Sequence, residues 1–353
     1  MADTVNLAVI GVGVPNQNLG GHGVYNGIGE VHGHFIGETE GARLVACCDL
    51  NEANGKAYAA KYGCAFHQNY DEMLARDDID AVAVCTPSGL HGRHAVQAAR
   101  AGKHVIVEKP LEITLPKVDQ ILEAVDAAGV RAVIVFPTRY YKGFAAVKEA
   151  LDKGRFGTPA VMHGLCRRYR DNVYYQGWRG TWQFDGGGAC INQGIHMIDA
   201  LCYLMDDIEA VQARFDTLGH DRDLCQVEDT AVAILQFRRG TLGIIEATTC
   251  AYNDYSDRIE IHGMKGSVSI SGGTVTSWLM RDEPDFAFQP EAFEPDRKEE
   301  FHGHRLLYSE VVPYFRDGTP CRCEIHSGRR AIALIDAIYR SSRQNGAEVR
   351  PDL

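Results

Sequence analysis

Hydrophobic positions in residues 1–137 alternate between two kinds of segment. Short apolar runs rich in β-branched residues, such as 105–107, are bounded by Gly or Pro and predict interior strands of a parallel sheet. Longer amphipathic segments between these runs are typical of helices. This alternation predicts a doubly wound parallel sheet, with strands at 6–10, 43–49, 80–85, 105–107 and 131–136 and helices at 28–36, 52–62, 70–76, 91–101 and 115–128.

The pattern changes at about residue 158, where strands dominate and lose their helical partners. Seven strands are expected, at 158–165, 209–215, 230–237, 241–248, 258–262, 267–271 and 274–280, with helices at 189–205, 303–316 and 327–342. The chain is therefore predicted to be α/β. An N-terminal Rossmann domain is expected at 1–137, and a C-terminal α+β domain with a large, mostly antiparallel sheet at 138–353.

Composition and charge narrow the classes of partner. The 353-residue chain has a net charge of −11 and no long run of Lys or Arg, which argues against binding to nucleic acid. No signal peptide and no membrane-length apolar run is present, so we expect a cytoplasmic protein without a membrane partner. The eleven cysteines match neither a disulfide framework nor a zinc pattern; they are interpreted as small buried hydrophobes, and no metal is expected.

A glycine motif follows the first predicted strand. Gly11 and Gly13 open a dinucleotide fingerprint, in which glycines allow a tight turn and close approach of a pyrophosphate. Residues 14–27 interrupt the motif, and Gly29 is interpreted as the displaced third glycine. Our hypothesis is that this insertion folds over the pyrophosphate and reaches the substrate through Asn16, Asn18 or His22; the alternative is a mobile surface loop.

Asp49 ends the second predicted strand. An acidic residue there accepts hydrogen bonds from the ribose hydroxyls of the cofactor and repels a 2′-phosphate, which favours NAD over NADP. The alternative role is a helix N-cap, although Asn51 could fill it. The turn 86–91 also falls at the carboxyl end of a strand, where its backbone could line the cofactor groove.

The strand at 105–107 runs directly into Glu108, Lys109 and Pro110. In an open α/β sheet the carboxyl ends of the strands form the ligand crevice, so Lys109 is expected to emerge where cofactor and substrate meet. The alternative is a solvated strand exit.

A polar stripe follows the three glycines at 186–188. Asn192, His196 and Asp199 are spaced i, i+4, i+7 and would lie on one face of a regular helix. The alternative is a solvent-facing helix, but the glycine entry and two nearby tryptophans favour a site. Upstream, cationic and aromatic residues alternate and suit a sugar pocket formed by Arg168, Tyr169, Trp178 and Arg179; an interface patch is the competing interpretation.

These motifs resemble the family of glucose-fructose oxidoreductase, inositol dehydrogenase and the rhizopine catabolism protein (Gfo/Idh/MocA), over nearly the whole chain. The resemblance rests on Gly11-x-Gly13, Asp49, Cys85-Thr86-Pro87-x-x-Leu90-His91, the Glu108-Lys109-Pro110 element and Asn192-x-Gly-x-His196. It implies that His196 is the catalytic acid/base, with Lys109 beside the substrate hydroxyl. Many polyol-oxidising members carry Asp where this chain has Asn192, and the Asn form is similar to a branch that includes sugar-nucleotide 3-dehydrogenases. The resemblance also implies a homodimer or homotetramer formed through the second sheet.

The chemistry of these residues is consistent with this assignment. Oxidation of a secondary alcohol removes a hydride, which nicotinamide accepts, and a proton, which a histidine can accept near neutral pH. Lys109 would stabilise the alkoxide, and Asn192, which cannot act as a base, would hydrogen-bond the substrate. The cofactor residues are expected to be Gly11, Gly13, Gly29, Asp49, Cys85, Thr86, Pro87, His91, Glu108 and Lys109.

The predicted function is therefore NAD-dependent hydride transfer at a secondary hydroxyl or ketone of a sugar, polyol or sugar derivative. Two alternatives stay open. One is NAD-assisted cleavage of a glycoside through a transient 3-keto sugar. The other is a nucleotide-sensing regulator without chemistry, against which the presence of both Lys109 and His196 argues.

Overall fold

The computed structural model describes residues 4–13, 27–205, 207–252, 255, 257–283 and 301–353. The chain forms two compact units, one of residues 1–137 with 303–328 and the other of 138–302 with 329–353. The sequence places 138–353 in one domain, whereas 303–328 packs with the first unit. Hydrogen bonds explain this difference, because Arg131 Nη1 donates to Phe315 O at 2.7 Å and Ile134 N donates to Cys323 O at 2.9 Å.

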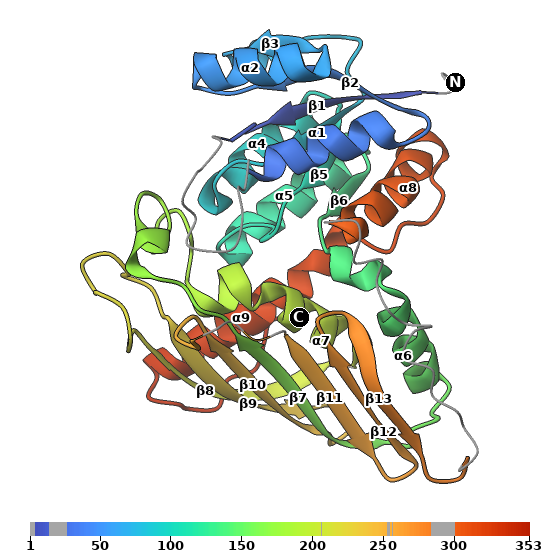
Figure 1. The fold of residues 1–353 in the computed structure, drawn as a ribbon, viewed down its shortest axis with the longest axis vertical. Coiled ribbons are helices and arrows are strands. Elements are labelled where there is room, and N and C mark those ends of the chain that lie inside the picture. The colour runs from blue at the N-terminus through green and yellow to red at the C-terminus, as the bar shows by residue number, and fades with distance from the viewer. Residues whose placement is uncertain (1–3, 14–26, 206, 253–254, 256, 284–300) are drawn as a thin grey trace. The chain divides into compact units, whose positions relative to one another are not determined.

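The first unit is a six-stranded sheet in the order β3-β2-β1-β4-β5-β6 with every pair parallel, which confirms the predicted Rossmann fold. Helices lie along its strands (Figure 1). Its strands are β1 (Val5–Ile10), β2 (Ala42–Cys48), β3 (Ala65–His67), β4 (Ala81–Val84), β5 (His104–Val107) and β6 (Ala132–Ile134). Its helices are α1 (Ile28–Glu38), α2 (Glu52–Tyr62), α3 (Tyr70–Leu74), α4 (His91–Arg100), α5 (Leu115–Ala128) and α8 (His302–Asp317).

Local sequence sets the ends of these helices. At the start of α2, the Asn51 side chain accepts a hydrogen bond from Asn54 N at 3.1 Å, as an N-cap does. At its end, Gly63 adopts φ 67°, a left-handed conformation that glycine takes without strain. Asn51 therefore fills the cap, which leaves the Asp49 carboxylate for other contacts.

The second unit is a seven-stranded sheet in the order β13-β12-β11-β7-β10-β9-β8. Only the β7 and β10 pair is parallel, so the mostly antiparallel sheet is confirmed. Its strands are β7 (Pro159–Arg167), β8 (Ile208–Asp216), β9 (Thr230–Phe237), β10 (Leu242–Thr248), β11 (Arg258–Gly263), β12 (Gly266–Ser271) and β13 (Thr274–Met280). Its helices are α6 (Lys142–Asp152), α7 (Ile195–Leu204) and α9 (Arg329–Arg343).

Burial alternates along the strands of this sheet. In β9 every second side chain is buried and the others face outward, which gives the sheet one packed face and one exposed face. Figure 1 shows α7 and α9 against the sheet, and α7 contacts β7 while α9 contacts β8. Among the described residues, none of the helices combines the length and hydropathy that a membrane span requires.

The predicted continuous helix over 189–205 is wrong. Residues Ala189–Gln193 form a π-helical turn, and α7 begins only after Gly194. The polar stripe is therefore not regular, because Asn192 and His196 lie on different kinds of helical turn. Asp199 is 1% exposed and forms a two-point ion pair with Arg139, at 3.0 and 2.6 Å, so it packs in the core of the second unit.

Candidate active site

The turn after β1 is built for close approach of a ligand or of another backbone segment. Gly11 adopts φ 83°, and a Cβ at this position would lie 2.8 Å from the carbonyl carbon of Cys85. A Cβ at Gly29 would lie 2.6 Å from the carbonyl oxygen of Gly11. Gly29 therefore lets the start of α1 press against the turn, which is the packing expected of the displaced third glycine. Gly13 also has a positive φ, of 81°.

Asp49 supports the same turn from β2. Its Oδ2 accepts a hydrogen bond from Val12 N at 3.0 Å, and its Oδ1 accepts one from Asn51 N at 2.8 Å. The carboxylate is therefore fixed beside the glycine turn, as an acidic residue facing an adenosine ribose would be. The insertion 14–27, with Asn16, Asn18 and His22, lies outside the described residues except for Gly27.

A buried histidine joins two loops at the carboxyl edge of the parallel sheet. His91 Nε2 lies 2.7 Å from Thr86 O, and Nδ1 lies 2.6 Å from Pro110 O. These contacts hold the 85–90 turn, which includes Cys85 and Pro87, next to the segment that follows β5. Both ring nitrogens of His91 contact protein carbonyls, so its effect on a cofactor would be exerted through the position of these loops.

Glu108 lies at the same edge, where its carboxylate meets two histidine side chains from distant parts of the sequence and the backbone N–H of the next residue. Its Oε1 lies 3.0 Å from His32 Nε2 and 3.6 Å from His304 Nε2, and its Oε2 accepts a hydrogen bond from Lys109 N at 2.9 Å. His32 Nδ1 in turn lies 2.6 Å from the Tyr308 hydroxyl. A proton on His32 Nε2 satisfies both contacts, because Nδ1 then accepts the proton of Tyr308.

Electrostatics keep this carboxylate charged. Burial by itself raises the pKa of Glu108, but the hydrogen bonds with His304 and His32 outweigh it and hold this pKa well below its usual range. Burial also lowers the pKa of His304, against the opposing effect of its contact with Glu108. The sequence gives no signal for this cluster, because His32 and His304 are separated by most of the chain.

Asn192 is held in a hydrogen-bonded chain within the second unit. Its Nδ2 donates to Asp185 Oδ1 at 2.6 Å, and its Oδ1 accepts from the Tyr174 hydroxyl at 3.0 Å. Gln193 Nε2 donates to the same hydroxyl at 2.8 Å. A carboxylate can only accept, so Asp185 fixes which end of the Asn192 amide faces which partner. Sequence reasoning missed Tyr174, Asp185 and Gln193.

Glu228 anchors the π-helical turn that carries Asn192. Its carboxylate accepts hydrogen bonds from Gly188 N at 2.8 Å, Cys190 N at 2.9 Å and the Tyr339 hydroxyl at 2.8 Å. Burial raises the pKa of Glu228 to about 7 in spite of these bonds. His196, the second residue of α7, follows this turn and is partly exposed.

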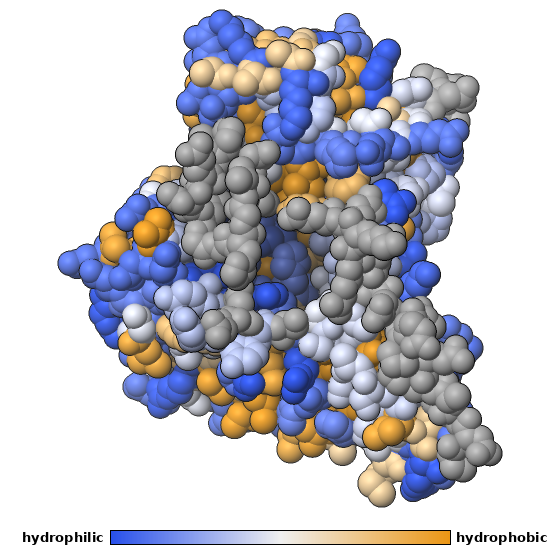
Figure 2. Space-filling view, viewed as in Figure 1, coloured by the Kyte–Doolittle hydropathy of each residue, from blue (hydrophilic) through white to orange (hydrophobic). Residues whose placement is uncertain are grey.

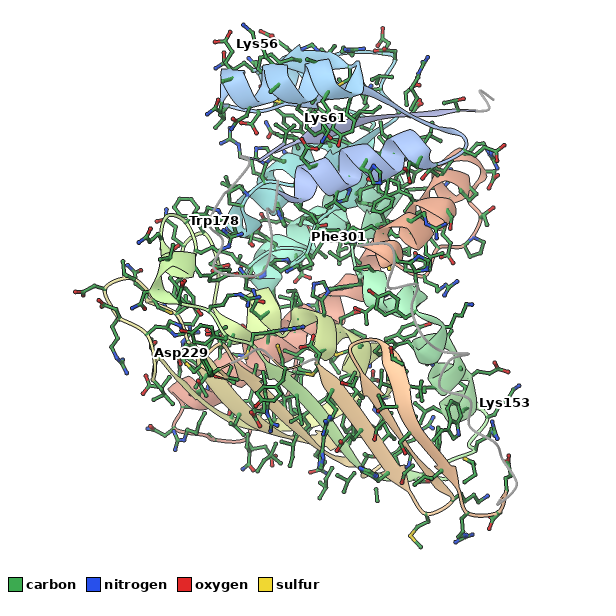
Figure 3. All side chains as sticks on the ribbon, in the orientation of Figure 1. Lys56, Lys61, Lys153, Trp178, Asp229 and Phe301 are labelled. Carbon is green, nitrogen blue, oxygen red and sulfur yellow. The ribbon has the colours of Figure 1, made fainter. Side chains whose placement is uncertain are left out.

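The residues expected to bind a sugar are distributed over one loop region of the second unit. The Arg179 guanidinium carbon lies 4.8 Å from the ring centre of Trp178, which Figure 3 labels, and 5.0 Å from that of Tyr174. Arg168 pairs with Asp257 at 3.0 Å, and the exposed Tyr169 packs against Tyr252. Tyr174 therefore contacts both Arg179 and Asn192, whereas the Arg168 side chain forms an ion pair with Asp257.

Comparison with known proteins identifies both halves of the chain. Residues 5–136 match the model of an oxidoreductase family with an NAD-binding Rossmann fold (GFO_IDH_MocA), and residues 144–269 match the GFO/IDH/MocA C-terminal domain. The WlbA dehydrogenase of Bordetella pertussis, solved in complex with NADH and UDP-GlcNAcA, is 31% identical with a TM-score of 0.84, covering 99% of each chain.

Curated relatives act on several polyols and sugars. Myo-inositol 2-dehydrogenase of Thermotoga maritima is 29% identical over 72% of this chain and 76% of its own. Levoglucosan dehydrogenase of Pseudarthrobacter phenanthrenivorans is 29% identical over 71% of this chain and 67% of its own.

Proposed function

Because this chain belongs to the Gfo/Idh/MocA family of oxidoreductases, with its NAD-binding Rossmann fold, we propose that it transfers a hydride between NAD and a secondary hydroxyl or ketone of a sugar, polyol or sugar derivative. The observation that carries the proposal is that several candidate residues lie together at the carboxyl edge of the parallel sheet. Lys109 follows β5 at the carboxyl edge that also holds the Gly11 turn and Asp49. This is the edge at which doubly wound sheets bind dinucleotides.

The protein residues would handle the proton and the developing charge. We assign His196 as the base that accepts the hydroxyl proton, and Lys109 as the cation that stabilises the alkoxide oxygen. Asn192 would hydrogen-bond the substrate with the amide orientation that Asp185 imposes. NAD supplies the hydride acceptor when it is bound.

We propose that NAD binds at the same edge of the parallel sheet. Gly11, Gly13 and Gly29 would make room for the pyrophosphate, and the close packing around Gly11 and Gly29 supports this role. Asp49 would bind the ribose hydroxyls and disfavour NADP. Backbone and side chains of Cys85, Thr86, Pro87, His91, Glu108 and Lys109 would complete the groove.

The substrate pocket is proposed to include Lys109, Arg168, Tyr169, Trp178, Arg179, Asn192 and His196. Arg179 between two aromatic rings suits an acidic sugar, because guanidinium groups bind carboxylates and phosphates with two hydrogen bonds. The bound UDP-GlcNAcA of the WlbA dehydrogenase supports testing nucleotide-linked acidic sugars beside neutral ones.

A substrate panel read by NADH absorbance tests the function. Inositols, free sugars, glycosides and sugar nucleotides are each offered with NAD, and at least one is expected to give NADH. Lys109→Met is expected to lower kcat/KM for that substrate by at least a thousandfold, about 4 kcal/mol of transition-state stabilisation. Unchanged turnover by this variant would contradict the mechanism. Cleavage of a glycoside without net NADH would instead select the transient 3-keto route.

We also propose that the exposed face of the seven-stranded sheet joins two copies of the chain into a homodimer or homotetramer. Val232, Ile234, Leu242 and Ile244 are exposed on this face. Figure 2 shows hydrophobic residues beside hydrophilic ones over the strands of this sheet. Replacing Ile234 and Ile244 with Asp is expected to yield monomers in light-scattering measurements, and an unchanged mass would contradict this interface.

A further inference from the structure

Three side chains with metal-binding atoms meet on the exposed face of the seven-stranded sheet. Strand pairing places His163 of β7 opposite Glu260 of β11, and His262 follows two residues later on the same face. His163 Nδ1 lies 3.4 Å from Glu260 Oε2, and His262 Nε2 lies 3.9 Å from the same oxygen. The sequence gives no metal-binding pattern here, because the ligands come from strands about a hundred residues apart.

These separations are long for hydrogen bonds, which span roughly 2.7 to 3.2 Å between N and O. They are closer to the spacing of atoms around one metal ion, because ligands bound at about 2.0 to 2.2 Å with tetrahedral angles lie about 3.3 Å apart. We propose that His163, Glu260 and His262 bind one divalent transition-metal ion, with Zn²⁺ as the ion that best suits two imidazoles and a carboxylate.

The surroundings favour this arrangement. His262 Nδ1 lies 3.1 Å from the Ser267 hydroxyl, which holds the ring with Nε2 turned toward Glu260, as outer-shell partners of metal ligands do. Arg258 lies 3.5 Å from the other oxygen of Glu260, so Oε2 is the oxygen that faces the imidazoles. The side chains of His163, Glu260 and His262 are 32%, 23% and 44% exposed within one copy of the chain. His163 pairs with Ile244, so in an assembly joined through this face the bound ion would lie at the interface between the copies.

Two other clusters of potential ligands in the described part of the chain fit a metal less well. The cluster around Glu108 is buried, and hydrogen bonds already occupy both ring nitrogens of His32 and both carboxylate oxygens of Glu108. In the cluster of His220, Asp229 and Cys250, Oδ2 of Asp229 (labelled in Figure 3) already accepts hydrogen bonds from the backbone N–H groups of 218–220 and contacts the His220 ring. Little lone-pair density is left there for a cation.

Titration of the full-length chain with Zn²⁺ after removal of metal by a chelator tests the site. His163→Ala, His262→Ala and Glu260→Gln are each expected to weaken binding of one Zn²⁺ equivalent by at least tenfold. His326→Gln is the matched control. This exposed histidine contacts Glu324 and Asp126 through opposite ring nitrogens, so it cannot chelate one ion with them. Equal Zn²⁺ affinity in the wild type and all three cluster variants would overturn the proposal.

Co²⁺ identifies the ligand type independently of NAD-dependent activity. A site made of two imidazoles and a carboxylate gives no thiolate charge-transfer band, whereas binding at Cys250 would give one that Cys250→Ser removes. We expect wild-type Co²⁺ spectra without this band and a Zn²⁺-dependent rise in Tm that His163→Ala abolishes. A thiolate band, or a rise in Tm that persists in His163→Ala, would locate the bound metal elsewhere and overturn the proposal.

Discussion

His32 Nε2 lies 3.0 Å from Glu108 Oε1, although the two residues are 76 positions apart in the chain. His32 is on α1, the helix that begins beside the glycine turn, and Glu108 follows β5 and precedes Lys109. The contact therefore ties the predicted phosphate-binding end of the first unit to the residue that we assign to the substrate oxygen. Removing the His32 side chain would leave the buried, charged carboxylate of Glu108 without one of its main hydrogen-bond partners.

His32→Ala is expected to lower the free energy of unfolding by about 3 kcal/mol, because loss of the imidazole leaves the buried, charged carboxylate of Glu108 without one of its hydrogen-bond donors. His34→Ala is the matched control on the same helix. His34 is exposed and pairs with Glu38 at 3.5 Å, so its loss is expected to cost under about 0.5 kcal/mol. Urea unfolding measures both values, and equal effects would contradict the importance of the buried cluster.

Gly29→Ala is expected to weaken NAD binding at least tenfold, about 1.4 kcal/mol, because the new Cβ would lie 2.6 Å from Gly11 O and push α1 away from the turn. Gly37→Ala on the same helix meets nothing within 4 Å and is expected to stabilise the protein by up to about 1 kcal/mol. Titration of the cofactor by fluorescence compares the two variants. Unchanged NAD affinity in Gly29→Ala would show that this close packing does not shape the cofactor site.

Glu228 is expected to make stability fall as pH rises. Burial raises its pKa to about 7 from 4.5, the usual value for a glutamate, so between these values the folded state holds a proton that the unfolded chain has lost. The folded state is therefore favoured at the lower pH, and the free energy of unfolding is expected to drop by roughly 2 kcal/mol between about pH 5 and about pH 7.5. Urea unfolding of the wild type and Glu228→Gln at both pH values isolates this contribution.

Glu228→Gln lacks the titrating carboxyl group. The difference in free energy of unfolding between the wild type and this variant is therefore expected to change with pH. Glu52→Gln is the control, since the hydrogen bond with Lys56 lowers the pKa of Glu52 and keeps its titration below this range. A difference between wild type and Glu228→Gln that stays constant with pH would contradict the raised pKa.

Local patterns were sufficient to predict most of the fold. The apolar run at 105–107 and the strict alternation along 230–237 each encode their own strand, and the order of elements then fixes the class of sheet. The π-helical turn could not be predicted, because the same side chains suit an α-helix and a π-turn equally and only Glu228 and the glycines around it select the turn.

The partners of the candidate site residues depend on distant parts of the chain. Glu108 and Lys109 were identified from the strand that ends in them, but His304 and Tyr308 reach this region through a helix nearly two hundred residues later. Residues 303–328 pack with the first unit through hydrogen bonds that leave no pattern in the sequence. The sequence therefore identifies candidate site residues more readily than it identifies the distant residues that orient them.

Asn192 and Asp185 provide the test of how the substrate side of the site is oriented. Asn192 Nδ2 donates to Asp185 Oδ1 at 2.6 Å, so Asn192→Asp would bring two carboxylates into contact. We expect this variant to lose about 2 kcal/mol of stability and most of its turnover at neutral pH, because one carboxylate must take up a proton or move away. The double variant Asp185→Asn with Asn192→Asp reverses the donor and the acceptor and is expected to recover at least half of the lost stability.

The full cycle of single and double variants measures the coupling between the two side chains, by urea unfolding and by NADH formation with the responsive substrate. Asp185→Asn alone removes the acceptor but creates no repulsion, so it is expected to be milder than Asn192→Asp. If the two substitutions were additive, the observed hydrogen bond would not determine the orientation of Asn192. Recovery of stability without recovery of turnover would show that the amide of Asn192, and not only its position, is needed by the substrate.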